Sequence, residues 1–493
     1  MQPQSPVAQN TAPLAASAAA APKSGNPAAG KKASAPLKAE LCMAAAVLAY
    51  AVTRFAPPLG GLTDAGQAVL GVAVAGMILW ISEAVPLGVT ALLVSALLGL
   101  SPGITLPQAL VGFTSEVTFY LVGVVAIGAA VESSGLAERA ARFLSRRARG
   151  NPTRLYAQMI AALPALAFLV PSAITRNAIL IPAYRDALGA MGISKTGRVG
   201  RALMLALGML NPLASSALLT GGIASMAAAT LLGGFSWLGW FAAMAVPYYA
   251  LILLGGIYLR VMVGPFETGN AEQPPAATAQ PLALAEIKTL ATLAVTAILW
   301  LTDRVHGLSP ALPALLAAIY LLCPGVGVLS WKTFESKLAW GLILTVGASM
   351  SLARLMTDTG AASWLGHMLV SQVVSLAAFP LALIVMLVAA VTLIHLAITN
   401  LAACIALLIP IAATMAEAAG LNAVVCGLVV TIAVDAVILY PVQTAANLLA
   451  YESGYFAASD VRRFGFGMLG LTIVVVLFSL PYWAMLGLPL TAP

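Results

Sequence analysis

Charged residues are scarce in this sequence: Asp, Glu, Lys and Arg together make up 8% of its 493 residues, whereas apolar residues make up 61%. A soluble domain usually carries about 25% charged residues. A chain this apolar lacks the polar surface that water requires, but it can face a lipid bilayer. Its successive apolar stretches of about 20 residues are long enough to cross a hydrocarbon core, and their backbone groups must pair internally, which predicts helices.

Cysteine and histidine are also few. The four cysteines have no CxxC spacing, so a disulfide framework or a thiolate metal site is not expected, and the three histidines lie far apart. Basic residues gather in short loops without interleaved aromatics, which argues against a nucleic acid partner. The apolar spans contain no HExxH motif, no GxSxG motif with a partner histidine and no paired acids, so we do not expect an intramembrane enzyme.

The apolar spans fall into two halves of similar length. Residues 1–36 are rich in Ala, Pro and Ser and are expected to form a disordered tail. We predict a first membrane repeat over residues 37–262, a polar linker over 263–283 and a second, inverted membrane repeat over 284–493.

Each half contains one apolar stretch that is too long for a single crossing. In the first half this stretch is 155–190, and basic residues flank both of its ends, so both ends are expected in the cytoplasm. A re-entrant hairpin with its tip at 171–177 satisfies this pattern, since non-helical backbone is tolerated at that depth when it is buried in protein. In the second half the stretch is 377–416, with its interruption at 397–400.

A broken helix follows each hairpin, over 202–232 and 421–451. The sequence therefore predicts an all-α polytopic membrane protein with about eleven transmembrane helices and two re-entrant hairpins in two inverted repeats. The loop charges place it in the inner (plasma) membrane, with the N-terminus cytoplasmic and the C-terminus outside. Inverted repeats with broken helices are typical of secondary transporters. We interpret the basic stretch 139–154 as a topology determinant and an interfacial helix, not as a ligand site.

Arg176 is the strongest candidate for a binding residue, because a cation at membrane depth is costly unless it has a partner or a function. Its guanidinium carries five donors in a fork that matches a carboxylate, and helix N-termini at the tip would add further donors. The competing interpretation is that Arg176 pairs with the buried acid Asp435 or extends to an interface.

Several other polar residues in the spans are candidates for ion coupling. Asp435 can be a proton carrier, a partner of Arg176 or an acid bonded to backbone in a kinked helix. His395 can be a proton shuttle or a packing residue, and small hydroxyl residues are ordinary at helix contacts in membranes. The candidates are Ser215, Ser216, Ser225, His395 and Asp435.

Four stretches resemble the divalent-anion/sodium symporter family of dicarboxylate and citrate transporters. They are residues 80–86 followed by 89–93, residues 131–136 before the basic stretch, the hairpin tip at 171–177, and residues 443–455. Taken together in this order, they extend the resemblance from about residue 40 to the end of the chain.

The resemblance implies where substrate would bind, and also where this chain departs from the family. Each tip of that family carries Ser-Asn-Thr; here Ser172 matches the Ser, but Ala173 and Ile174 replace Asn and Thr. Arg176 fits the Ser-Asn-Thr-Ala-Arg variant of the citrate/dicarboxylate exchanger branch, and Ala402 stands at a Thr position of the second tip. The implied substrate-binding residues are Ser172, Thr175, Arg176, Asn177, Thr399, Asn400, Thr220, Gly221, Thr444 and Asn447.

The preferred function is secondary active transport of small organic di- or tricarboxylate anions, or similar divalent anions, by alternating access. The alternatives are a cation/proton antiporter or arsenite-type permease and, in a different class, an intramembrane enzyme or a structural membrane protein. No cofactor is expected. Sodium is the coupling ion that the resemblance implies, although the missing motif oxygens argue against it. A homodimer is expected from the resemblance alone.

Overall fold

The computed structural model describes residues 36–491 apart from 58, 83–84, 171, 269–280, 339, 374–378 and 399–400. In this part of the chain the secondary structure is helical, and extended pairing is limited to one isolated bridge between Leu421 and Thr491. The prediction of an all-α fold is therefore confirmed. The tail predicted over residues 1–36 lies almost wholly outside the described residues.

The first half contains twelve numbered α-helices and two short 3-10 turns. They are α1 (Pro36–Phe55), α2 (Asp64–Ser82), α3 (Leu87–Gly99), α4 (Leu106–Ala109), η2 (Val111–Thr114), α5 (Glu116–Ser134), α6 (Leu136–Arg147), α7 (Pro152–Leu169), α8 (Ala173–Ala190), α9 (Arg198–Met209), α10 (Asn211–Ser216), η3 (Leu219–Gly221), α11 (Ile223–Leu231) and α12 (Trp237–Val263).

The second half follows a similar order of long and broken helices. It contains α13 (Leu284–Leu301), α14 (Asp303–His306), α15 (Ala311–Leu322), α16 (Trp331–Lys337), α17 (Trp340–Asp358), α18 (Ala361–Val373), α19 (Pro380–Ala397), α20 (Leu401–Ala418), α21 (Ala423–Ala436), α22 (Ala445–Glu452) and α23 (Ala458–Met485). Of the described helices, α5, α12, α13, α17 and α23 each have the length and apolar composition to cross a membrane. The count of eleven crossings stays a prediction.

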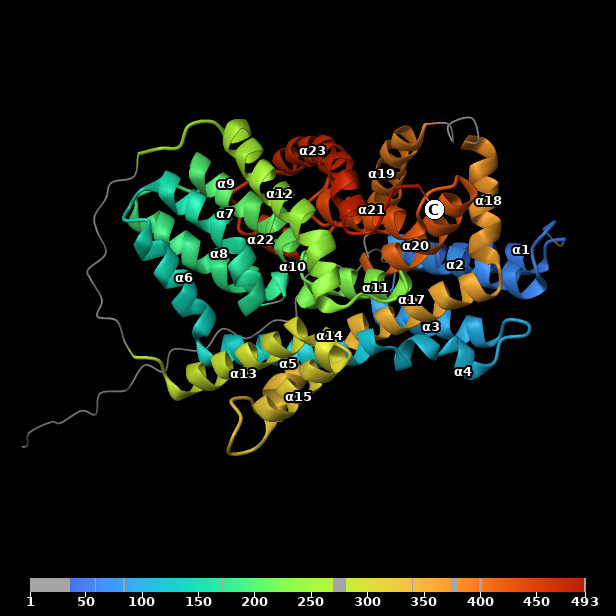
Figure 1. Ribbon diagram of the computed structural model, residues 1–493, viewed down its shortest axis with the longest axis horizontal. Helices are drawn as coiled ribbons and strands as arrows, with labels where there is room; N and C mark the ends of the chain where they lie inside the picture. Colours follow the sequence, from blue (N-terminus) through green and yellow to red (C-terminus); the bar gives the residue numbers. More distant parts are fainter. Residues whose placement is uncertain are drawn as a thin grey trace, which may run out of the picture.

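Each of several contacts between helices occurs a second time between the corresponding helices of the other half. Helix α3 packs on α17 and α5 packs on α15, while α8 contacts α22 and α11 contacts α20. Likewise α7 packs on α12 and α19 on α23. Figure 1 shows α3, α5, α13, α15 and α17 on one side of the molecule and the broken helices on the other. Each contact type thus occurs twice, as expected for two related repeats.

Small residues bring the helices of the two halves close together. Gly88 on α3 faces Gly341 on α17, and an added Cβ at Gly88 would lie 3.1 Å from the Gly341 Cα. An added Cβ at Gly123 on α5 would lie 2.6 Å from Ala314 on α15. Glycine and alanine at such contacts let helix backbones approach closely, which is how membrane helices gain packing energy without a hydrophobic drive.

Helices α7 and α8 form the first predicted hairpin. Near the start of α7, the Tyr156 ring lies 5.3 Å from that of Phe266, just beyond α12, and the adjacent Glu267 accepts a hydrogen bond from the start of α9. At the far end of α7, Phe168 packs on Trp237 at the beginning of α12. The chain therefore enters along α7 and returns along α8 to the end from which it came.

The tips of the two hairpins fall between α7 and α8 and between α19 and α20. The backbone of Val170 is extended. Ser172 caps the N-terminus of α8 by accepting the Thr175 backbone N–H at 3.3 Å. The first break is therefore shorter than the predicted 171–177, and Arg176 and Asn177 lie in the first turn of α8. The second break falls between α19 and α20, as predicted, and its residues 399–400 are outside the described part.

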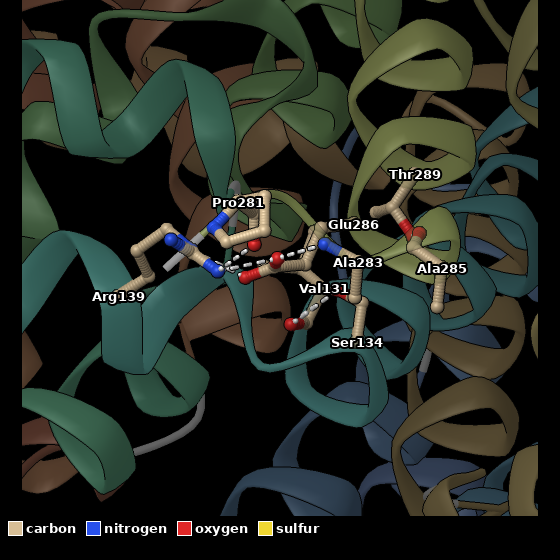
Figure 2. Close-up of polar contacts among 8 residues, drawn as sticks. All are labelled: Val131, Ser134, Arg139, Pro281, Ala283, Ala285, Glu286 and Thr289. Carbon is tan, nitrogen blue, oxygen red and sulfur yellow. Dashed lines mark hydrogen bonds and ion pairs between the residues drawn. The ribbon is translucent and has the colours of Figure 1, made fainter. Parts of the chain in front are cut away.

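An ion pair joins the start of α6 to the start of α13 (Figure 2). Arg139 Nε lies 2.6 Å from Glu286 Oε1, and Arg139 Nη2 lies 2.7 Å from Oε2. Nη2 also donates to the Pro281 carbonyl, and Glu286 accepts the Ala283 N–H at 2.7 Å, which caps α13. Gly135, with φ 79°, makes the left-handed turn from α5 into α6. A bidentate pair thus links the two halves beside a glycine junction.

Candidate functional site

The centre of the site is the guanidinium of Arg176, which is 2% exposed. Its Nε donates to Asn211 Oδ1 at 2.7 Å, and its Nη2 donates to the Asn211 carbonyl at 2.8 Å and to Ser215 Oγ at 2.7 Å. Its Nη1 donates to the Val170 carbonyl at the end of α7. The cation therefore holds the hairpin tip against the first broken helix through oxygens of both.

A network of asparagine amides extends from this cation to the second repeat. Asn211 Nδ2 donates to Asn177 Oδ1 at 2.8 Å and to the Ala173 carbonyl at 3.2 Å. Asn177 Nδ2 in turn donates to the carbonyls of Leu207 on α9 and Ala446 on α22, each at 2.9 Å. Hairpin tip, first broken helix and second broken helix therefore meet at one buried polar centre.

Asn447 completes this centre from the second repeat. Its backbone N–H donates to Thr444 Oγ1, which caps the N-terminus of α22. Its Nδ2 donates to the carbonyls of Tyr440 and Pro441. Its buried Oδ1 has no hydrogen-bond partner within the described residues. A Cβ added at Gly208 would lie 2.5 Å from this oxygen, so α9 needs glycine there for α22 to approach. The free acceptor suits a donor or a cation.

Asp435 lies in a second polar cluster, apart from Arg176. The Tyr248 hydroxyl of α12 donates to Asp435 Oδ2 at 2.6 Å, and Ser216 lies beside the same carboxylate. The described ion pairs include none between Arg176 and Asp435. The interpretation that Arg176 pairs with Asp435 is therefore wrong: the arginine is bonded to amide, carbonyl and hydroxyl oxygens, and the acid to a phenol.

Thr220 and Gly221 form the break between α10 and α11. The Thr220 carbonyl accepts from the Tyr120 hydroxyl of α5, and its Oγ1 accepts from Trp237 Nε1 at 2.9 Å. A Cβ at Gly221 would lie 1.7 Å from the Ser215 carbonyl, so only glycine fits. The Thr220 side chain therefore already has a protein partner in this conformation, and the tight turn depends on the absent side chain of Gly221.

Ser225 lies in the first turn of α11, just after the same break. Its Oγ donates to the carbonyl of Gly222, the residue directly before α11. This local bond is a common use of serine at a helix start. Ser225 therefore lies near the other predicted ion-coupling serines in sequence but is bonded to its own turn.

Around the second tip, His395 is fully buried and its Nδ1 lies 2.9 Å from the Ile398 carbonyl. Its Nε2 has no partner within the described residues. A small hollow of about 10 Å³ beside Ile398 is lined also by Trp80 and Ser349, whose Nε1 and Oγ likewise have no described partner. An indole N–H can only donate, so Trp80 Nε1 can bond only to an acceptor.

The structure thus brings most of the predicted residues into two neighbouring polar clusters. Ser172, Thr175, Arg176, Asn177, Ser215 and Asn447 belong to the first cluster, and Ser216 and Asp435 to the second. Thr399 and Asn400 lie outside the described residues. Sequence reasoning missed four residues: Asn211 and Tyr248, which carry much of the bonding, and Trp80 and Ser349, which line the hollow beside Ile398.

Neutral oxygens and one buried cation dominate this centre, and the described residues contain no group of three or more His, Cys, Asp or Glu that could hold a metal. Such a centre can bind an anion by charge and by hydrogen bonds. Together with the helical fold and its two repeats, it indicates a membrane transporter.

The family follows from the sequence match. Residues 38–489 match the sequence model of the family described as the sodium:sulfate symporter transmembrane region. The match spans nearly the whole chain, so the protein belongs to this family.

Two bacterial relatives extend over most of both chains. A "membrane protein" of Cupriavidus necator is 27% identical over 482 residues, covering 90% of this chain and 92% of the relative. An "uncharacterized transporter" of Haemophilus influenzae is 27% identical over 425 residues, covering 82% and 89%. The human solute carrier family 13 member 2 is 30% identical over 166 residues, which is 34% of this chain and 27% of that protein.

The fold also has a solved counterpart. The crystal structure of the Alcanivorax borkumensis YdaH transporter, described as having an unusual topology, matches with a TM-score of 0.53 and 16% sequence identity. The match covers 85% of this chain and all of that one. It shows a shared transporter fold.

Proposed function

We propose that this protein exchanges small divalent organic anions, such as di- or tricarboxylates, across the membrane by alternating access. The family and the fold support anion transport in general. The observation that carries the finer proposal is the buried guanidinium of Arg176, which bonds the oxygens of the first tip and of the first broken helix.

A resident cation changes how the substrate charge is balanced. The resemblance implies that the tips supply oxygens for sodium, whereas here Arg176 donates to the Val170 and Asn211 carbonyls and to Ser215. Those oxygens are already satisfied by a positive charge that cannot leave the protein. An arriving anion then finds a fixed compensating charge and the N-terminal end of α8, which favours anions.

The proposed substrate site lies between this centre and the second tip. Ser172, Thr175 and Asn177 border it from the first hairpin, and the breaks containing Thr220, Gly221, Thr444 and Asn447 border it from the two broken helices. The second tip, with Thr399 and Asn400, would contribute from the opposite repeat. Arg176 supplies charge more than a free fork, because its Nε, Nη1 and Nη2 each already donate to protein oxygens.

Exchange is the expected mode of transport because a fixed charge does not move with the substrate. We expect sodium dependence to be weak or absent. Purified protein in liposomes should take up succinate, citrate, sulfate or tartrate only when the vesicles contain one of these anions. Each assay is run with sodium and with choline outside. Uphill uptake into anion-free vesicles that requires sodium would overturn both the exchange and the sodium proposals.

A proton-coupled mechanism is the second candidate, in line with the antiporter alternative, and Asp435 is the observation that favours it. This acid is 6% exposed and bonded to Tyr248. If Asp435 carries a proton during transport, Asp435→Asn should abolish the response of uptake to an imposed pH gradient while anion exchange at equal pH persists. If exchange is also lost, Asp435 belongs to the structure of the site.

We further propose an inner-membrane location with the N-terminus in the cytoplasm, the C-terminus outside and a homodimeric assembly. The clustering of Lys and Arg in alternate loops supports the orientation, and family membership supports the dimer. Crosslinking of the protein in membrane vesicles tests the assembly.

A further inference from the structure

The corner between α6 and α7 holds a surface hollow that lies apart from the transport site. The hollow has a volume of about 670 Å³ and is lined by Phe143, Arg147, Arg149, Arg154 and Gln158. This volume falls within the range typical of ligand sites, about 300–1,000 Å³. Three of its five lining side chains are cations, so its occupant should be an anion.

Some basic residues of the described chain have an acidic partner, and the three arginines of the hollow do not. Arg139 pairs with Glu286, Arg201 with Asp460 and Lys337 with Glu132. By contrast, the ion pairs of the described residues include none of the three arginines of the hollow. Their charges face one space without a compensating acid, and the sum of such fields attracts anions.

The start of α7 adds to this positive field. Helix α7 has 18 residues, and Arg154 in its first turn lines the hollow. Asn151 accepts the Arg154 N–H at 3.0 Å and Pro152 has no N–H, so Thr153 supplies the remaining N–H of the first turn. A helix N-terminus carries a partial positive charge and favours phosphate groups. Cations and helix end therefore point to the same kind of ligand.

The backbone of the corner is held in an uncommon conformation. Arg149 has φ 49°, and no other non-glycine residue of the described chain has a positive φ. Gly150 follows with φ 71°. Such a conformation is unfavourable for a non-glycine residue. It brings Arg149 into the same hollow as Arg147 and Arg154.

The hollow also has an apolar side. Phe143 is 59% exposed, and the Arg147 guanidinium lies 6.0 Å from its ring centre. An exposed aromatic next to clustered arginines is suited to a ligand with a charged head and an apolar tail. The basic stretch was interpreted above as an interfacial helix and not as a ligand site; the hollow revises the second part of that interpretation.

We propose that this hollow binds the phosphate headgroup of an anionic phospholipid, with Arg147, Arg149 and Arg154 around the phosphate and Phe143 beside the lipid chains. The bound lipid would hold the α6–α7 corner, and with it the base of the first hairpin, at the membrane surface. The proposal does not depend on which anion is transported.

The test is native mass spectrometry of the purified full-length protein in detergent, titrated with phosphatidylglycerol or phosphatidylcholine. The wild type should bind at least one phosphatidylglycerol more tightly than phosphatidylcholine. Because each basic residue near such a surface contributes about 1 kcal/mol, Arg147→Gln/Arg154→Gln should weaken this binding by about 10- to 30-fold. Arg149→Asn, which tolerates the same backbone conformation, should weaken it by about fivefold.

The matched control is Arg462→Gln/Arg463→Gln, which removes two exposed charges near the start of α23 and should leave phosphatidylglycerol binding unchanged. Arg147→Lys/Arg154→Lys keeps the charge and should retain most of the binding even if the glutamine variant folds poorly. Unchanged binding in the glutamine variant, or an equal loss in the control, would overturn the proposal. Displacement of the lipid by millimolar inorganic phosphate would instead identify a site for soluble phosphate.

Discussion

The Tyr248 hydroxyl on α12 donates a hydrogen bond to the Asp435 carboxylate on α21 across 2.6 Å. This bond joins the last helix of the first repeat to the second broken helix. Ser216, on the first broken helix, lies beside the same acid. One buried carboxylate therefore links parts of the chain that belong to both repeats, and its donor can be removed by deleting a single oxygen.

Tyr248→Phe should destabilise the protein by about 1.5–3 kcal/mol, the usual range for a hydrogen bond to a charged group. The reason is that the buried carboxylate loses its closest donor. Thermal unfolding in detergent measures the effect. In an Asp435→Asn background the same substitution should cost clearly less, because the charge is gone. Equal losses in both backgrounds would mean that Tyr248 acts only through packing.

Arg176 and Asp435 should behave as independent residues. Because they do not contact one another, the losses in unfolding free energy caused by Arg176→Ala and Asp435→Ala should add to within about 0.5 kcal/mol. Arg176→Ala and Asn211→Ala should not add, since each removes the same hydrogen bond from Arg176 Nε to Asn211 Oδ1. Recovery of stability in the Arg176→Ala/Asp435→Ala double variant would instead indicate a direct ion pair.

Gly208→Ala should disrupt the contact between α9 and α22. The added Cβ would lie 2.5 Å from Asn447 Oδ1 and 3.2 Å from the Ala450 Cβ, and overpacking of this kind costs about 1–3 kcal/mol. Gly189→Ala on α8 is the matched control, because nothing lies within 4 Å of the new methyl. Thermal stability and anion exchange should both fall in the first variant and stay near wild type in the second.

The carboxylate of Glu267 should make stability depend on pH. Partial burial raises the pKa of this carboxylate. Hydrogen bonds from backbone N–H groups, including those of Arg198 and Val199, lower the pKa by more than burial raises it, so the net shift is downward. A lowered folded pKa gives stability that is present above the unfolded value of about 4.3 and is lost as the pH falls. The Tm advantage of wild type over Glu267→Gln should therefore be full at pH 7 and shrink below about pH 4.3.

Residues 149 and 196 should be accessible from the same side of the membrane. Both are exposed, one before the first hairpin and one after it. In a background in which Cys42 and Cys323 are replaced by Ser, single cysteines at the two positions should both resist a membrane-impermeant thiol reagent in intact cells. Both should react in inverted vesicles. Labelling of only one in intact cells would make α7 and α8 a full crossing.

The first hairpin was predictable because two signals agree. Basic residues flank both ends of 155–190, and the length of the stretch excludes one simple crossing. The exact tip was not predictable, since a side chain decides it: Ser172 accepts the Thr175 N–H, so α8 begins at Ala173 and takes Arg176 into its first turn. From the sequence alone, a run of polar residues predicts a loop, even where a side chain caps a helix within that run.

The partners of Arg176 could not be predicted for a different reason. A buried cation suggests a buried acid as its partner, and Asp435 is an acid within an apolar span. The actual partner, Asn211, lies 35 residues after Arg176 and precedes a proline, which in sequence marks only a helix break. Tyr248 sits in an apolar run and reads as a packing residue. Which of these polar groups face one another depends on how the two repeats pack.

The junction at Gly135 gives helix α6 the geometry of a lever. Its 12 residues span ~18 Å, and Arg139 stands only ~6 Å along it. A rotation of ~30° about Gly135 would carry the far end, with its arginine hollow, through ~9 Å, but Arg139 through only ~3 Å. The ion pair with Glu286 lies where the lever travels least, so it can fix the pivot while the base of the hairpin moves.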